Sequence, residues 1–154
     1  MTTQYRLGFR LKGIIFLHRI NEPRIGSHGL RLLELFTAMW GYEALPNIAL
    51  VSTMWTKVDR GEALRRETEM RGDIWKNLAA NGASMFQYND SPEMAETIVS
   101  MLTNKRNNVV LRIQRELMDK KPLKSTSAGK LVHSDIEKRL DESRKTMRSL
   151  EEGI

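Results

Sequence analysis

The residues best suited to chemistry lie in the stretch 47–59, with the sequence NIALVSTMWTKVD. It begins with the apolar run IALV, which is typical of a buried strand. Threonine hydroxyls, the ammonium of Lys57 and the carboxylate of Asp59 follow directly. Because open α/β sheets bind ligands at the carboxyl ends of their strands, this order predicts a binding site after the strand. The alternative is an ordinary turn in which Asp59 caps the next helix.

Other kinds of site find little support. The three histidines, His18, His28 and His133, lie far apart and lack the spacing of metal ligands, so we expect no metal site. Without cysteine, the chain forms neither a disulfide nor a thiolate nucleophile. Leu131 follows Gly129-Lys130, and the sequence contains neither a Gly-x-x-x-x-Gly-Lys-Ser/Thr phosphate loop nor Asp-x-x-Gly. We therefore expect no catalytic residue.

The composition is that of an ordinary globular chain. With 154 residues, 40% of them hydrophobic and 29% charged, it is long enough for one domain and too short for two. No segment approaches the roughly 20 apolar residues that span a bilayer, and the basic N-terminus lacks the apolar core of a signal peptide. We expect a soluble, cytoplasmic protein.

The net charge of +6 permits a nucleic acid as partner. Basic residues alternate with acidic ones through 59–73 and 135–152, however, as they do on solvated helix faces. Aromatic residues make up only 6% of the chain and do not alternate with basic ones, as they would on a base-stacking surface. A nucleic-acid binder, whose affinity would fall steeply with salt, is the least favoured class.

The elements that must position the stretch 47–59 alternate between strand and helix. Such an order predicts parallel strands joined by right-handed crossovers, with helices on the faces of the sheet. The predicted fold class is α/β, half of a doubly wound sheet. The predicted strands are Gly13–Ile20, Ile48–Val51 and Ala83–Tyr88; the predicted helices cover about 30–40 and 59–80, and a third follows Ser91 as N-cap with Pro92 in its first turn.

The last third of the chain differs from the first hundred residues. A helix is predicted at Val109–Met118, and Ser125–Ser127 is predicted to cap the next one. The last predicted helix, Leu131–Leu150, is mostly charged and carries a thin apolar stripe. We expect this helix to pack on the domain edge or to contact a partner, including a second copy of the chain, with a short coiled coil as the less favoured arrangement.

Three segments resemble the second half of the GTPase-like G domains of fungal proteins, within the P-loop NTPase superfamily. They are GIIFLHRI (13–20), LRLLELF (30–36) and NIALVSTMW (47–55), the last followed by Lys57-Val58. The later segment IQRELMDKKPLKSTSAGK (113–130) resembles the part that follows the G domain. The resemblance covers roughly residues 11–150. It implies a three-layer, P-loop-NTPase-like half domain at 13–104, a C-terminal helical extension at 105–154 and an N-terminal remnant at 1–12.

The resemblance also implies a site for guanine nucleotides, GTP or GDP. Thr56-Lys57-Val58-Asp59 is similar to the Asn/Thr-Lys-x-Asp motif, in which the carboxylate accepts hydrogen bonds from two guanine donors that adenine lacks. Asp59 would take that role, and the stem of Lys57 would cover the base. Thr53 or Trp55 would line the base pocket if the strand ends early. The loop 89–91 would lie at the second base-contacting position.

The phosphate loop, the switch threonine and Asp-x-x-Gly of a complete G domain would precede 13–20, and they do not occur in this chain. Mg²⁺ would bind only together with that missing half, and we expect no hydrolysis by this chain alone. The expected function is a truncated G domain that retains guanine recognition. The alternative is a non-enzymatic interaction module that uses its exposed helices. An open edge strand at 14–17 further predicts a marginal monomer that self-associates.

Overall fold

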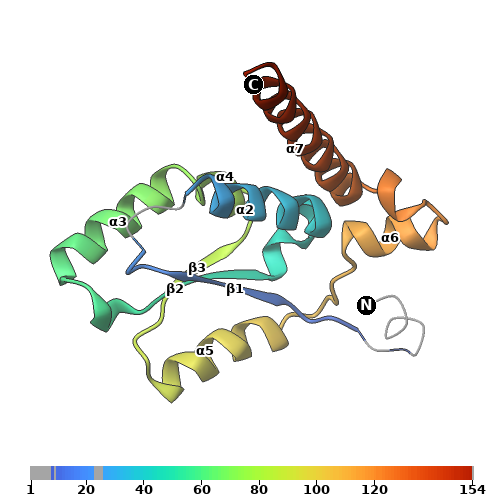
Figure 1. The fold of residues 1–154 in the computed structure, drawn as a ribbon. Coiled ribbons are helices and arrows are strands. Elements are labelled where there is room, and N and C mark those ends of the chain that lie inside the picture. Colours follow the sequence, from blue (N-terminus) through green and yellow to red (C-terminus); the bar gives the residue numbers. More distant parts are fainter. Residues whose placement is uncertain (1–7, 9, 23–25, 154) are drawn as a thin grey trace.

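The centre of the fold is a parallel sheet of three strands in the order β1-β2-β3 (Figure 1). The computed structural model describes residues 8, 10–22 and 26–153, so most of the segment 1–12 lies outside the described residues. The strands are β1 (Ile14–Arg19), β2 (Ile48–Thr53) and β3 (Ser84–Gln87). All three predicted strands are thus confirmed, and so is the α/β class with its parallel sheet.

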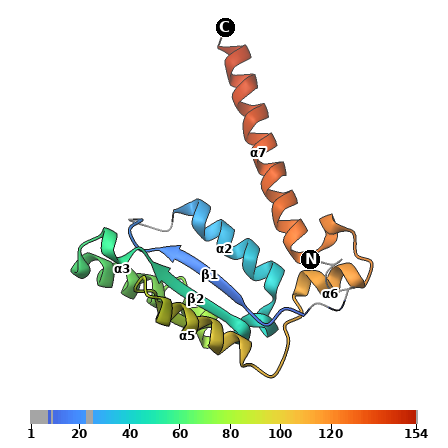
Figure 2. The ribbon, with the colours of Figure 1, turned by 90° about the horizontal axis from the view of Figure 1, so that it is seen from below.

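Helices cover both faces of the sheet (Figures 1 and 2). Three of them, α2 (Ser27–Trp40), α3 (Arg60–Gly72) and α4 (Lys76–Ala80), pack on the face that carries Ile48 and Leu50. The helix α5 (Pro92–Thr103) packs on the opposite face. Every residue of β2 is buried, as expected for the central strand of a sheet covered on both sides.

Side chains next to the helix starts satisfy backbone N–H groups that have no partner inside the helix. The hydroxyl of Ser91 accepts from the N–H of Met94 (3.2 Å), and Pro92 follows in the first turn, as predicted. The hydroxyl of Thr126 accepts from the N–H of Gly129 (3.0 Å) and caps the last helix, so the predicted cap within Ser125–Ser127 is confirmed.

Four predicted helices have different bounds. The first, predicted from about residue 30, already begins at Ser27 in α2. The segment predicted as one helix from 59 to 80 is divided at 73–75, where the chain turns and the indole of Trp75 becomes fully buried in the core. The helix predicted from Val109 begins instead at Arg112, as α6 (Arg112–Met118), because the N–H of Val109 donates to Leu11 (2.7 Å) in an isolated antiparallel bridge. The last helix, α7 (Ser127–Glu152), is longer at both ends than predicted.

The helix α7 extends away from the sheet (Figure 2). Its first turns lie against α2, where Nε of Arg31 donates to Oδ2 of Asp135 (2.6 Å) and Nη2 donates to Oδ1. Beyond that contact its large apolar side chains are exposed. Among the described residues, no helix combines the length and apolar character that a bilayer crossing needs.

Candidate functional site

The candidate site lies at the carboxyl ends of β2 and β3. The strand β2 ends at Thr53, and Met54 then adopts a left-handed conformation with φ 63° and ψ 34°. A single 3₁₀ turn follows at Trp55–Lys57, and α3 begins after Asp59. The chain therefore reverses away from the sheet within a few residues, and the side chains of this turn stand at the sheet edge.

The turn after β3 lies beside the turn after β2. The N–H of Tyr88 donates to the carbonyl oxygen of Ser52 (2.8 Å), which continues the strand pairing to the end of β2. The side chain of Asn89 accepts from both the N–H (3.1 Å) and the hydroxyl (2.7 Å) of Ser91, the N-cap of α5. Its carboxamide oxygen is thereby engaged within the turn. The two turns form one continuous rim.

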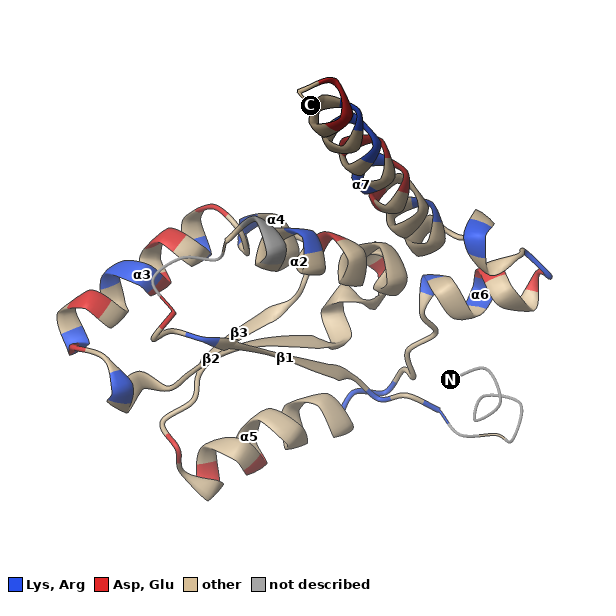
Figure 3. Ribbon diagram, viewed as in Figure 1, with Lys and Arg blue, Asp and Glu red and all other residues tan. Residues whose placement is uncertain are grey.

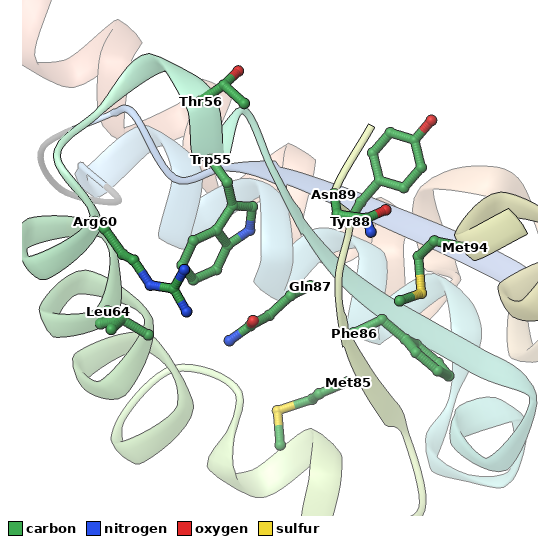
Figure 4. Close-up of a pocket in the computed structure, with 10 residues that line it drawn as sticks. All are labelled: Trp55, Thr56, Arg60, Leu64, Met85, Phe86, Gln87, Tyr88, Asn89 and Met94. Carbon is green, nitrogen blue, oxygen red and sulfur yellow. The ribbon is translucent and has the colours of Figure 1, made fainter. Parts of the chain in front are cut away.

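This rim borders a pocket of about 640 Å³ that also reaches α3 (Figure 4). The side chains of Trp55, Arg60 and Gln87 point toward the same space, while those of Phe86 and Met94 lie on the other side of β3. The pocket is lined by Trp55, Thr56, Arg60, Leu64, Met85, Phe86, Gln87, Tyr88, Asn89 and Met94.

The indole of Trp55 forms a fixed wall of the pocket. Its Nε1 donates to the carbonyl oxygen of Ser52 (3.2 Å) and lies 3.1 Å from the Ser52 hydroxyl. These contacts to a fully buried residue of β2 set the orientation of the ring. A half-buried aromatic ring held in this way offers a flat surface on which a planar ligand can stack.

A buried carboxylate orients a second group of the pocket. Glu67 of α3 is 4% exposed and accepts from the Ser52 hydroxyl (3.2 Å), from Nη2 of Arg71 (3.1 Å) and from Nε2 of Gln87. The amide nitrogen of Gln87 is therefore directed at Glu67. The amide oxygen of Gln87 has no hydrogen-bond partner among the described residues, so it remains an acceptor for a ligand.

The pocket also contains a cation, Arg60, in the first turn of α3. Its guanidinium makes no hydrogen bond or ion pair with any described residue. The neighbouring arginines differ, because Arg65 and Arg66 bind Glu62 and lower the pKa of its carboxyl to about 2. Arg66 also donates to the carbonyl oxygen of Ile20 (3.0 Å) and ties α3 to the end of β1. Among these three, Arg60 is the cation left to meet an anionic ligand.

Two of the five predicted site residues, Trp55 and Thr56, line this pocket. Thr53 is buried and lines a different cavity, on the α5 side of the sheet. Lys57 and Asp59 are exposed and line neither cavity. Asp59 has the alternative role, because its Oδ2 accepts from the N–H groups of Gly61 (2.9 Å) and Glu62 (3.3 Å) as the N-cap of α3.

The sequence did not single out Arg60 or Gln87 as site residues. Gln87 did carry a usable signal, since a polar residue at the end of an apolar strand points to the rim of the sheet. Arg60 carried no such signal, because arginines recur throughout the first turns of α3. Asn89 belongs to the loop 89–91 that the resemblance had placed near the base.

Within the described part of the chain, no cluster of three or more His, Cys, Asp or Glu side chains is arranged to hold a metal ion. Comparison of the chain with models of protein families, with curated proteins and with solved structures found no match.

Proposed function

We propose that the protein is a G-domain-like module of the P-loop NTPase type that binds a guanine nucleotide in the pocket between the β2–α3 and β3–α5 turns. One observation carries this proposal: the ring of Trp55, the cation of Arg60 and the oriented amide of Gln87 converge on one pocket. That pocket lies at the carboxyl ends of two parallel strands, where α/β sheets bind ligands.

The order of the elements supports the P-loop NTPase type. Strand, helix, strand, helices, strand and helix follow one another as in the half G domain that 13–104 resembles. The helices α2 to α4 share one face of the sheet and α5 takes the other, which gives the three layers expected for that fold.

The base would stack on the indole of Trp55. The free amide oxygen of Gln87 would accept a hydrogen bond from the edge of the base, where guanine has two adjacent N–H donors. The preference for guanine rests on this match and on the resemblance of 47–59. The role that the resemblance gives to Lys57 and Asp59 stays a prediction, and binding in the pocket does not require it.

The guanidinium of Arg60 would meet a phosphate group. We propose binding alone and no hydrolysis, because the sequence contains no Gly-x-x-x-x-Gly-Lys-Ser/Thr loop. Without such a loop most phosphate contacts are missing, so we expect weak, millimolar affinity for guanosine monophosphate and for GTP or GDP.

Tryptophan fluorescence tests this proposal. Trp40 and Trp75 are 4% and 0% exposed, so a change on ligand addition reports mainly on Trp55. We expect saturable quenching by guanosine monophosphate at millimolar concentration and weaker quenching by adenosine monophosphate. Arg60→Ala should weaken the binding several-fold, whereas Arg65→Ala, an exposed arginine of the same helix outside the pocket, should not. Equal loss in both variants, or no quenching by either nucleotide, would contradict the proposal.

The second candidate function is a non-enzymatic interaction module. It is favoured by the row of exposed apolar side chains on α7 beyond its contact with α2. A chain that shows no nucleotide binding but associates through α7 would select this function. A chain that binds nucleotide and also associates through α7 would have both functions.

A further inference from the structure

The distal part of α7 carries an exposed apolar stripe. Ile136, Leu140, Met147 and Leu150 are 53%, 49%, 61% and 64% exposed. They recur with the heptad spacing of a coiled coil, in which Leu140 and Met147 take the a positions and Ile136 and Leu150 take the d positions. Ser143 occupies the d position between them.

The stripe does not coincide with the surface of α7 that docks on α2. The residues that α7 turns toward α2 are Leu131, Val132, Asp135 and Arg139, which occupy c, f and g positions and none of the a or d positions of the stripe. A second helix can therefore lie along the stripe while α2 stays in place. Figure 2 shows α7 extending away from the sheet, with no described element beside its distal half.

The charges that flank the stripe alternate in sign. The e positions hold Lys130, Glu137, Arg144 and Glu151. All four side chains are exposed. Figure 3 shows the mixture of basic and acidic residues along this helix. In coiled coils the residues at e and g decide which helices pair and in which direction.

We propose that two copies of the chain associate through their α7 helices, packed antiparallel about a two-fold axis. Ile136 then packs against the partner's Met147, and Leu140 packs against the partner's Ser143. In an antiparallel pair the e positions face one another, so Glu137 meets the partner's Arg144 and Lys130 meets the partner's Glu151. The two-fold axis repeats each contact, and all four e-position pairs are attractive.

Other arrangements bring like charges together. In a parallel pair, Arg139 at a g position lies beside the partner's Arg144, and the symmetry repeats that repulsion. Sliding one helix of the antiparallel pair by one heptad also brings like charges together. A shift in one direction places Arg144 opposite the partner's Arg144, and a shift in the other direction places Glu137 opposite the partner's Glu137. The charge pattern therefore selects one direction and one register. Because the stripe is short, we expect a weak dimer with a dissociation constant in the micromolar range.

Sedimentation velocity of the full chain over a range of concentrations tests this dimer. Leu140→Lys should abolish it, while Ser149→Lys, an exposed position outside the stripe, should leave it unchanged. Circular dichroism of each variant would verify that the chain is folded. A monomer at all concentrations, or a dimer that survives Leu140→Lys, would overturn the proposal.

Charge reversal tests the register. Glu137→Arg and Arg144→Glu should each weaken the dimer by about three- to tenfold, since each turns two attractive pairs into repulsive ones. The double variant Glu137→Arg/Arg144→Glu should restore the original affinity. If both single variants weaken the dimer and the double variant does not restore it, the antiparallel register is wrong.

Cysteine cross-linking reports the direction independently, because the chain has no cysteine of its own. A mixture of the variants Ile136→Cys and Met147→Cys should form a mixed disulfide on oxidation. Either variant alone should form little, since identical positions lie about 16 Å apart along the axis and a disulfide needs Cα atoms within about 7 Å. Preferential cross-linking of identical positions would show a parallel pair and overturn the proposal.

Discussion

At the scale of single residues, the site depends on side chains that hold other side chains in place. Glu67 is buried and makes contact with Ser52, Arg71 and Gln87, so its carboxylate links β2, α3 and β3. Ser52 in turn orients the indole of Trp55. A buried carboxylate with several hydrogen-bond donors is stable because the donors replace its lost hydration.

The two roles considered for Asp59 can be separated by substitution. Asp59→Ala removes both the helix cap and the carboxylate, and it should lower the free energy of unfolding by about 0.5 to 2 kcal/mol. Asp59→Ser keeps a capping oxygen without the charge, and it should leave the stability almost unchanged. Urea denaturation measures both effects. If Asp59→Ser is as destabilising as Asp59→Ala, the cap does not explain the role of this residue.

The variant Asp59→Ser also tests whether Thr56-Lys57-Val58-Asp59 acts as a guanine-recognition motif. If the carboxylate reads guanine, as the resemblance implies, Asp59→Ser should lose the preference for guanosine over adenosine monophosphate while the protein stays stable. If the base is held in the pocket without Asp59, that preference should persist in Asp59→Ser.

We predict that His18 makes the stability depend on pH near neutrality. Its ring packs edge-on against Trp75 (centroids 6.3 Å apart), and burial lowers the pKa of His18, with a smaller opposing effect of Glu22. The unfolded chain therefore binds more protons between this lowered pKa and about 6.5, so stability should fall as the pH drops through that interval. Denaturation midpoints from pH 7 to 5 would show this fall, and His18→Gln should flatten it.

The carboxyl groups of Asp135 and Glu62 affect the stability in a different pH interval from His18. Arg31 lowers the pKa of Asp135, and Arg65 and Arg66 lower that of Glu62. These groups stabilise the fold above their unfolded pKa values, so their contribution is lost only below about pH 4.5. A fall in stability confined to that acid range, with none from pH 7 to 5, would contradict the role given to His18.

At the scale of elements, the strands were predictable because each is a short run of apolar residues between turn signals. The division between α3 and α4 was not, because the periodicity of charged residues continues across 73–75 while burial of Trp75 decides the turn. The residues around Val109 fit either a helix or a strand by their pattern. The antiparallel bridge between Leu11 and Val109 decides for an extended conformation. Tertiary contacts overrode local preference in both cases.

The pocket was predictable only in part for a similar reason. The turn after β2 could be read from the sequence, but the residues of β3 that face it depend on the strand register, which places Gln87 opposite Ser52. Whether the side chain of Arg60 reaches the pocket depends on the direction in which α3 leaves the sheet. Both the register and this direction are set by packing between segments that lie far apart in the sequence, so the residues of the turn alone do not reveal them.

The start of α7 has a specific packing requirement. A Cβ atom at Gly129 would clash with the backbone of Leu123, whereas one at Gly153 would meet Ser149 at 3.2 Å near the exposed end. Gly129→Ala should therefore destabilise the first turns of α7 by about 1 to 3 kcal/mol, and Gly153→Ala should have a much smaller effect. Hydrogen exchange of the amides at 127–135 would measure the difference. Unchanged protection in Gly129→Ala would show that the junction tolerates the methyl group.

At the scale of the whole molecule, the sheet is open at both edges within the described residues. Ile15 and Leu17 of β1 are 40% and 63% exposed. Together with the stripe on α7 they leave two apolar surfaces uncovered in one small domain. The marginal stability and the self-association expected from the open edge strand stay a prediction. The variants of α7 distinguish this self-association from pairing through α7, because they change only the helix.

Base binding in the pocket is the central claim, and a nuclear magnetic resonance titration of the ¹⁵N-labelled chain with guanosine monophosphate tests it most directly. We predict saturable shifts of the Trp55 indole N–H, the Thr56 amide and the Gln87 side-chain amide, with smaller shifts for adenosine monophosphate. The indole signals of the buried Trp40 and Trp75 should stay in place. No saturable shift at millimolar nucleotide, or shifts confined to residues outside the pocket, would contradict nucleotide binding at this site.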